Sequence, residues 1–98
     1  MQITQKLDGT TLRLSLKGRL STDTINELDE IVSNKLDNIN KLILDFSNLE
    51  FISSAGLRII LKIKREHDDT KVVHVIDEVF DVFEMVGFNN FLTIEKKA

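Results

Sequence analysis

Hydrophobic and polar residues alternate strictly between residues 11 and 18, the pattern of a strand with one buried face. Leucines occupy every second position of this run, with arginine, serine and lysine between them. A weaker run covers residues 2–7, and Asp8-Gly9 separates the two. Because Asp-Gly favours a tight hairpin turn, we predict two strands joined at this turn.

A helical spacing replaces the alternation after residue 24. The apolar residues recur every three or four positions, which predicts an amphipathic helix packed by one stripe. Residues 21–24 offer several N-cap side chains, and Thr24 and Glu27 have the spacing of a capping box. The apolar stripe consists of Ile25, Leu28, Ile31, Val32, Leu36 and Ile39.

The stretch that organises the chain runs from Lys41 to Glu66. The apolar run at residues 42–44 predicts a central strand buried on both faces. Residues 45–50 are mostly polar and predict a turn. A second helix is then expected to start at Ser53-Ser54, and its apolar residues cover more than half of its circumference.

The start of this second helix is the first candidate for function. Free N–H groups and a partial positive charge collect at a helix N-terminus, so Ser53 and Ser54 lie where an anion is favoured. The alternative is that Ser53 is only the N-cap and Ser54 only a first-turn residue. Glycine in a first turn costs about 0.5–1 kcal/mol relative to alanine. We therefore predict that Gly56 admits a partner backbone or a phosphate, and that Gly56→Ala keeps or raises stability.

The rest of the chain predicts two more strands and one more helix. Residues 71–76 form a β-branched strand, residues 78–86 a helix ended by Gly87, and residues 91–94 a short last strand. Lys62, Lys64 and Arg65 end the second helix, where we expect a solvated group that matches the helix dipole rather than a binding patch. The predicted fold is a single α/β domain over residues 1–98, with a mixed sheet of four or five strands and helices packed on it.

Composition narrows the function classes. The chain has 98 residues, a net charge of −3 and no cysteine. Bulk charge therefore gives no support to nucleic-acid binding, and disulfide or thiolate chemistry is excluded. The N-terminal residues do not resemble a signal peptide, and no apolar run approaches the roughly 20 residues of a membrane span. We expect a soluble cytoplasmic protein that binds neither nucleic acid nor membrane.

The sequence offers little catalytic chemistry. No GxxxxGK[ST] or GxGxxG phosphate loop occurs, and His67 and His74 have no spacing that suggests a ligand set. The acidic residues around the third helix are explained by dipole matching and solvation. We predict no catalytic residue, no metal site, no cofactor and no enzymatic activity.

The residues 42–61, LILDFSNLEFISSAGLRIIL, resemble the signature of STAS domains, specifically of the anti-sigma factor antagonists. The segments 18–21 (GRLS) and 79–91 (VFDVFEMVGFNNF) match the pattern of the same family. The resemblance therefore covers nearly the whole chain.

The resemblance implies a protein that binds a cytoplasmic serine kinase, which is also the anti-sigma factor, and so releases the sigma factor. The kinase phosphorylates the motif serine with ATP, and a PP2C-type phosphatase removes the phosphate. The implied acceptor is Ser54. Ser53 stands where the family usually has Asp, and is the second candidate acceptor. The implied partner-binding residues are Asp45, Ser53, Ser54, Gly56 and Arg58.

Two alternatives stay open beside this hypothesis. The chain can be a non-phosphorylated STAS scaffold or accessory subunit of a signalling or transport complex, with Ser54 only a capping residue. It can also be a nucleotide-binding or hydrolytic domain, against which the missing phosphate loop argues.

Overall fold

The computed structural model describes residues 1–35 and 38–97. Five strands form one sheet in the order β1-β2-β3-β4-β5, with β1 antiparallel to β2 and the other pairs parallel. The predicted α/β fold with a mixed sheet is confirmed. The elements are β1 (Gln2–Asp8), β2 (Thr11–Leu20), α1 (Ile25–Lys35), β3 (Lys41–Ile52), α2 (Ser54–Glu66), β4 (Thr70–Val75), α3 (Asp77–Met85), the 3-10 helix η2 (Phe88–Asn90) and β5 (Thr93–Lys96).

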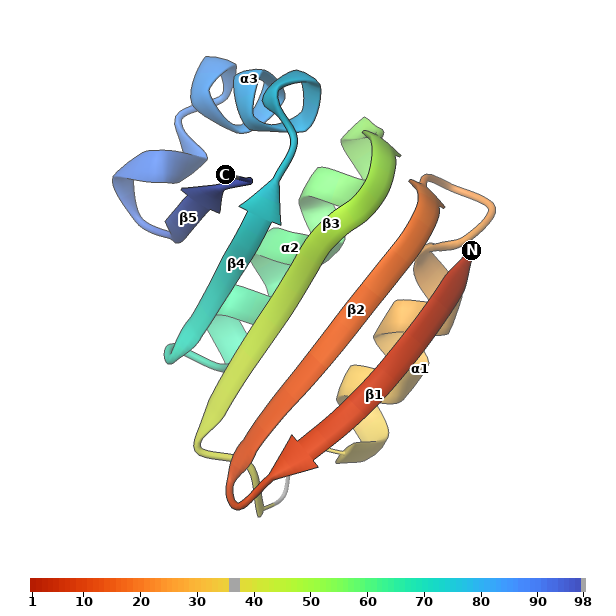
Figure 1. Ribbon diagram of the computed structural model, residues 1–98, viewed down its shortest axis with the longest axis vertical. Coiled ribbons are helices and arrows are strands. Elements are labelled where there is room, and N and C mark those ends of the chain that lie inside the picture. The colour runs from red at the N-terminus through yellow and green to blue at the C-terminus, as the bar shows by residue number, and fades with distance from the viewer. Residues whose placement is uncertain (36–37, 98) are drawn as a thin grey trace.

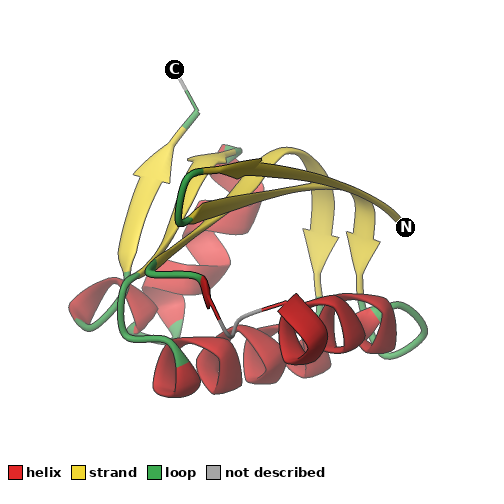
Figure 2. Ribbon diagram, turned by 90° about the horizontal axis from the view of Figure 1, so that it is seen from below, coloured by secondary structure: helices red, strands yellow, loops and turns green. Residues whose placement is uncertain are grey.

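The order of the strands explains how the helices are arranged. From β2 onward each parallel connection moves to the next strand in the same direction, and such connections are right-handed in nearly all proteins. Successive crossover helices are therefore expected on the same face. Figure 1 shows α1 and α2 behind the sheet and α3 beyond the end of β4, and Figure 2 shows helices beneath the sheet. In the described part of the chain no helix covers the opposite face, called the open face below.

The core lies between the sheet and the helices. Aliphatic side chains of β2, β3 and β4 pack against α1 and α2. A row of four phenylalanines, three buried and the last 46% exposed, continues from this core, with centroids of successive rings 6.2, 5.8 and 5.1 Å apart. They join the centre of the sheet to α3 and η2, and are Phe46, Phe83, Phe88 and Phe91.

The central strand is longer than the sequence predicts. β3 continues to Ile52, so the turn expected over residues 45–50 is wrong. These polar residues stay extended because β2 pairs with β3 along most of its length, and strand pairing outweighs weak local preferences. The register shifts by one residue between Asp45 and Asn48. Because of this shift, the alternation of buried and exposed side chains along β3 is interrupted, and Leu49 is buried in the core.

Burial of residues 42–44 on both faces is also wrong. Leu42 and Leu44 are buried against the helices, whereas Ile43 is half-buried on the open face. The two-sided apolar pattern misleads here because nothing in a local sequence shows that one face lacks a covering helix.

The first helix ends earlier than its apolar stripe. α1 ends at Lys35, so Ile39 is not helical, although it packs against the core; Leu36 lies outside the described residues. The predicted capping box is not formed among the described residues. The Thr24 hydroxyl instead donates to the Arg19 carbonyl at 2.6 Å and accepts the Ser21 N–H at 2.9 Å, closing the turn between β2 and α1.

The C-terminal elements appear where they are expected, with shifted ends. β4 and α3 each begin one residue before the predicted range, and β5 is displaced by two residues toward the C-terminus. Gly87 follows α3 with φ 79°, the left-handed conformation expected of a glycine that ends a helix.

The open face holds a buried carboxylate. Asp45 is 8% exposed. Its oxygens accept from the Arg13 guanidinium at 2.7 Å and the Ser47 N–H at 3.0 Å, and the Nδ1 of His74 lies 3.2 Å away. Burial alone raises the pKa of Asp45, but these hydrogen bonds together lower it from 3.8 to about 2. The ionised carboxylate therefore stabilises the fold.

His74 reaches this carboxylate through a bulge in β4. The pairing of β4 with β5 shifts between Val72 and Val75, and His74 adopts φ 57°. A left-handed conformation costs a residue other than glycine about 1–2 kcal/mol. The contact with Asp45 offsets part of this strain.

Gly56 lies against the end of β2 inside the molecule. A Cβ at this position would stand 2.7 Å from the Leu20 carbonyl oxygen and 2.8 Å from Cγ1 of Ile52. Gly56 is buried, so the close approach that we predicted for a partner is made by the protein itself. The expectation that Gly56→Ala keeps or raises stability is therefore wrong.

Asp45→Asn should lower the free energy of unfolding at pH 7 by about 2 kcal/mol. The pKa of Asp45 is lower in the folded state than in the unfolded chain. Its contribution is therefore complete above about pH 4 and is lost as the pH falls toward 2. Urea unfolding between pH 2 and 7 should show that the free energy of unfolding of the wild type falls as the pH falls below about 4, and that the variant lacks this fall. As a control, Glu95→Gln removes an exposed ion pair with Lys71 and should change stability by less than about 1 kcal/mol. Equal pH profiles for wild type and Asp45→Asn would contradict this role.

Gly56→Ala should destabilise the protein by about 1–3 kcal/mol, because the added methyl group meets a backbone carbonyl. Without that contact, the substitution would instead gain up to about 1 kcal/mol from helix propensity. Thermal unfolding distinguishes the two signs. Ser54→Ala in the same turn is the matched control and should leave stability nearly unchanged. A Gly56→Ala variant more stable than wild type would show that α2 moves away freely.

Candidate functional site

The N-terminus of α2 presents one serine to solvent and uses the other as its cap. Ser53 has φ −96° and ψ 176°, and its hydroxyl accepts the Gly56 N–H at 3.2 Å. Ser54 is the first helical residue and is exposed. Among the described residues its hydroxyl makes no hydrogen bond within the protein. Because Ser53 already caps the helix, the Ser54 hydroxyl is not needed for folding.

The ends of β2 and β3 fix this position. The Ser53 N–H donates to the Leu20 carbonyl at 2.9 Å, which ties the start of α2 to the last residue of β2. On the same edge, the Arg19 guanidinium lies 4.1 Å from the centre of the Phe51 ring. Phe51 is 38% exposed, so this edge adds an apolar and cationic surface close to the serines.

Two hollows lie along α2 from this end. A hollow of about 190 Å³ is lined by Ala55, Arg58, Ile59 and Lys62 of α2 together with Ile25 of α1. A second hollow, of about 510 Å³, is lined by Arg58, Leu61, Lys62, Arg65 and Glu66. Arg58 and Lys62 line both hollows and stand between them; the two hollows together are called the α2 groove below. The groove was missed from the sequence, although its basic residues recur at helical spacing, four and then three positions apart.

The structure brings only some of the predicted partner-binding residues together. Ser53, Ser54 and Arg58 lie in the first two turns of α2 and its cap. Gly56 is in the same turn but is buried. Asp45 lies in the middle of β3 on the open face, hydrogen-bonded inside the protein. A contact between Asp45 and a partner at Ser54 has no support in this geometry.

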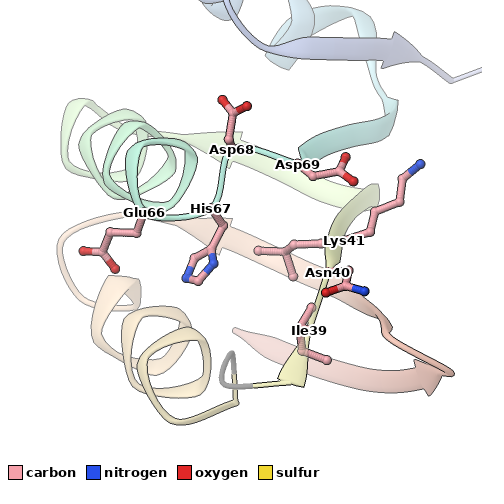
Figure 3. A pocket seen from close by; sticks show the side chains of 8 residues that line it. Ile39, Asn40, Lys41, Glu66, His67, Asp68 and Asp69 are labelled. Atoms are coloured by element: carbon pink, nitrogen blue, oxygen red, sulfur yellow. The ribbon is translucent and has the colours of Figure 1, made fainter.

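A polar hollow lies at the other end of α2 (Figure 3). It has a volume of about 260 Å³, and its lining includes Glu66, His67, Asp68 and Asp69. Figure 3 shows the three carboxylates pointing in different directions, and Asp68 pairs with Lys64. Over residues 1–35 and 38–97 no group of histidine, aspartate and glutamate side chains could hold a metal ion. The lining of this hollow therefore offers no set of metal ligands.

The helices of the described residues are all too short or too polar to cross a membrane.

Several solved structures share this fold. The chain aligns with the Bacillus anti-sigma factor antagonist SpoIIAA at 18% identity, with a TM-score of 0.76 to its unphosphorylated form, covering 99% of this chain and 89% of that one. The phosphorylated form gives a TM-score of 0.74, covering 95% and 90%. An anti-sigma factor antagonist from Mycobacterium paratuberculosis gives 0.86 at 17% identity, covering 96% and 84%. The murine anion transporter Slc26a9 gives 0.72 at 14% identity, covering 95% of this chain but 17% of the transporter.

At these identities the likenesses show the fold alone. No curated protein matches the chain in sequence. The family model described as STAS domain matches residues 2–98, which is nearly the whole chain and includes β3, the serines and α2. The chain therefore belongs to the STAS domain family.

Proposed function

We propose that this protein is an anti-sigma factor antagonist that binds a serine-kinase anti-sigma factor and is released from it by phosphorylation at Ser54. The exposed Ser54 hydroxyl, next to a cap made by another residue, supports this proposal most directly. A kinase can reach this hydroxyl without unfolding the helix. Ser53 is the weaker acceptor because its oxygen already accepts the Gly56 N–H.

The proposed switch consists of two group transfers. The kinase transfers the γ-phosphoryl group of ATP to Oγ of Ser54, and ADP and the hydroxyl proton are released. A PP2C-type phosphatase then adds water across the P–O bond, restoring the hydroxyl and releasing inorganic phosphate. The protein itself contributes no catalytic group to either step, so its part is that of a binding module.

The phosphate acts at the surface of the protein. It adds about −1.5 to −2 charges near pH 7 at a helix N-terminus, where the dipole favours negative charge by about 0.3–1 kcal/mol. The first turn of α2 carries no acidic side chain that would repel it. The helix therefore stays folded, while a partner packed against Ser54 meets a strongly hydrated dianion.

A second candidate function is a non-phosphorylated scaffold or accessory subunit. The likeness to a segment of the Slc26a9 transporter favours it, because a domain of this fold can form a small part of a larger assembly. Under this alternative Ser54 is never phosphorylated. Copurification of the native protein would then recover a signalling or transport complex without a serine kinase.

Ser54→Ala should abolish phosphate incorporation from ATP by a candidate serine-kinase anti-sigma factor, while the variant still folds and binds that kinase. Ser53→Ala should lose about 0.5–2 kcal/mol of stability with the cap, yet still be phosphorylated. Mass spectrometry of the reaction product and thermal unfolding measure the two effects. Phosphate that persists in Ser54→Ala but disappears in Ser53→Ala would reverse the assignment. No phosphate on either serine with any serine kinase that binds the protein would favour the scaffold.

Ser54→Asp should keep or slightly raise the unfolding temperature, because one negative charge at the helix N-terminus is worth about 0.3–1 kcal/mol. The same variant should bind the kinase more weakly than wild type. The loss should be smaller than that caused by phosphate, because aspartate has less charge and fewer oxygens. Calorimetric titration measures both affinities. Unchanged affinity in Ser54→Asp and in the phosphorylated protein would rule out release by charge at this position.

A further inference from the structure

The exposed charges of α2 and α3 are of opposite sign. The whole chain carries −3, and the exposed part of α3 is acidic, with Asp77, Glu78, Asp81 and Glu84. The exposed part of α2 is basic instead. Arg58, Lys62 and Arg65 are all exposed and recur at i, i+4 and i+7, so they form one row along the helix.

This basic row borders the α2 groove. Ile25, Ala55, Ile59 and Leu61 supply the apolar part of the lining, and the three cations stand among them. The groove extends from Ala55 to Glu66, which is about 16 Å along a helix axis and about three helical turns. Its apolar and cationic lining therefore suits a segment with an apolar face and acidic flanks.

We propose that the α2 groove binds an acidic amphipathic helix of the protein's partner. Apolar side chains of that helix would cover the half-buried Ile25 and Ala55, and its carboxylates would pair with the cationic row, in the manner of other helices that bind in grooves. The opposite charges specify which helix fits and speed its approach. The identity of the partner rests on the proposed function, whereas the binding of an acidic helix depends only on the groove.

Arg58 connects this surface to Ser54. The two residues are at i and i+4 on α2, so their side chains are neighbours. Within the described residues Arg58 makes no ion pair or hydrogen bond, whereas Lys62 is paired with Asp29 at 3.0 Å. Arg58 is therefore available to a partner carboxylate. A phosphate on Ser54 would accept hydrogen bonds from the same guanidinium, and would compete with the partner at the end of the groove.

A basic groove can also attract nucleic acid or an anionic membrane. The overall negative charge opposes both, and Asp29 and Glu66 border the row of cations. The acidic helix is therefore favoured, and the other two ligands become outcomes of the test.

The first experiment titrates the ¹⁵N-labelled protein with a synthetic helical peptide that carries leucine on one face and glutamate on the other. The amides of residues 55–66 should shift in a saturable way below ~1 mM peptide, and the shifts should weaken in roughly 0.5 M NaCl, where charges are screened. The control is a peptide with lysine in place of glutamate, which should not shift them. Saturable shifts elsewhere, no saturation, or tighter binding of duplex DNA or phosphatidylserine vesicles would overturn the proposal.

A pair of variants with the same charge change tests the row itself. Arg58→Glu should weaken binding of the glutamate peptide about 5-fold or more, since one exposed ion pair is worth up to about 1 kcal/mol and the reversal adds repulsion. Lys17→Glu alters net charge equally, but lies on β2 away from the groove, and should leave the affinity within about 2-fold. Both variants have exposed side chains at these positions, and matching spectra outside the groove would verify their folds. Equal losses in the two would show that only net charge matters.

The third measurement uses protein with phosphoserine incorporated at position 54 during translation. Phosphoserine should weaken peptide binding in the Arg58 protein by about 5-fold or more, and by less in an Arg58→Ala background, where no guanidinium is shared. Equal fold-changes in both backgrounds would refute competition for Arg58. None of these titrations needs a kinase. If the peptide binds but no kinase phosphorylates Ser54, the groove proposal stands and the proposed function is rejected. If Ser54 is phosphorylated but the peptide does not bind, only the groove proposal is rejected.

Discussion

One carbonyl oxygen determines where the proposed binding surface begins. The Leu20 oxygen accepts the Ser53 N–H at 2.9 Å and lies where a side chain on residue 56 would otherwise project. Only glycine lets the first turn of α2 come so close to the end of β2. With Ser53 held as the cap and Gly56 turned inward, Ser54 remains outside. The exposure of Ser54 thus follows from packing inside the molecule.

The close contact at Gly56 shows which features of the site local sequence rules can predict and which they cannot. Local rules identified Ser53 as a cap, Ser54 as an exposed first-turn residue and Gly56 as a site of close approach. They could not tell what approaches, because a glycine looks the same whether its neighbour is a partner or another strand. Asp45 was misplaced for a related reason. A polar residue after an apolar run suggests a turn, and only the pairing with β2 keeps it in the strand.

The layering of the fold explains why binding is proposed on a helix. In many α/β sheets the strand order reverses, and ligands bind in the crevice at that reversal. Here the strands follow chain order from β1 to β5, so the described sheet has no such reversal. The surfaces left are the open face, where Asp45 is engaged internally, and the outer side of the helices, where α2 combines an exposed serine with a cationic groove.

The same strand order has a consequence for how the native state opens. Each strand pairs only with the strands that precede and follow it in the sequence. The last strand, β5, can therefore detach from β4 without breaking any other strand pairing. β5 has four residues and an irregular register beside His74, which makes it the least secured edge. Amide hydrogens of β5 should therefore exchange with solvent through local unfolding, whereas those of β3 should exchange only on global unfolding. Local motion at the C-terminal edge would leave the geometry around Ser54 undisturbed.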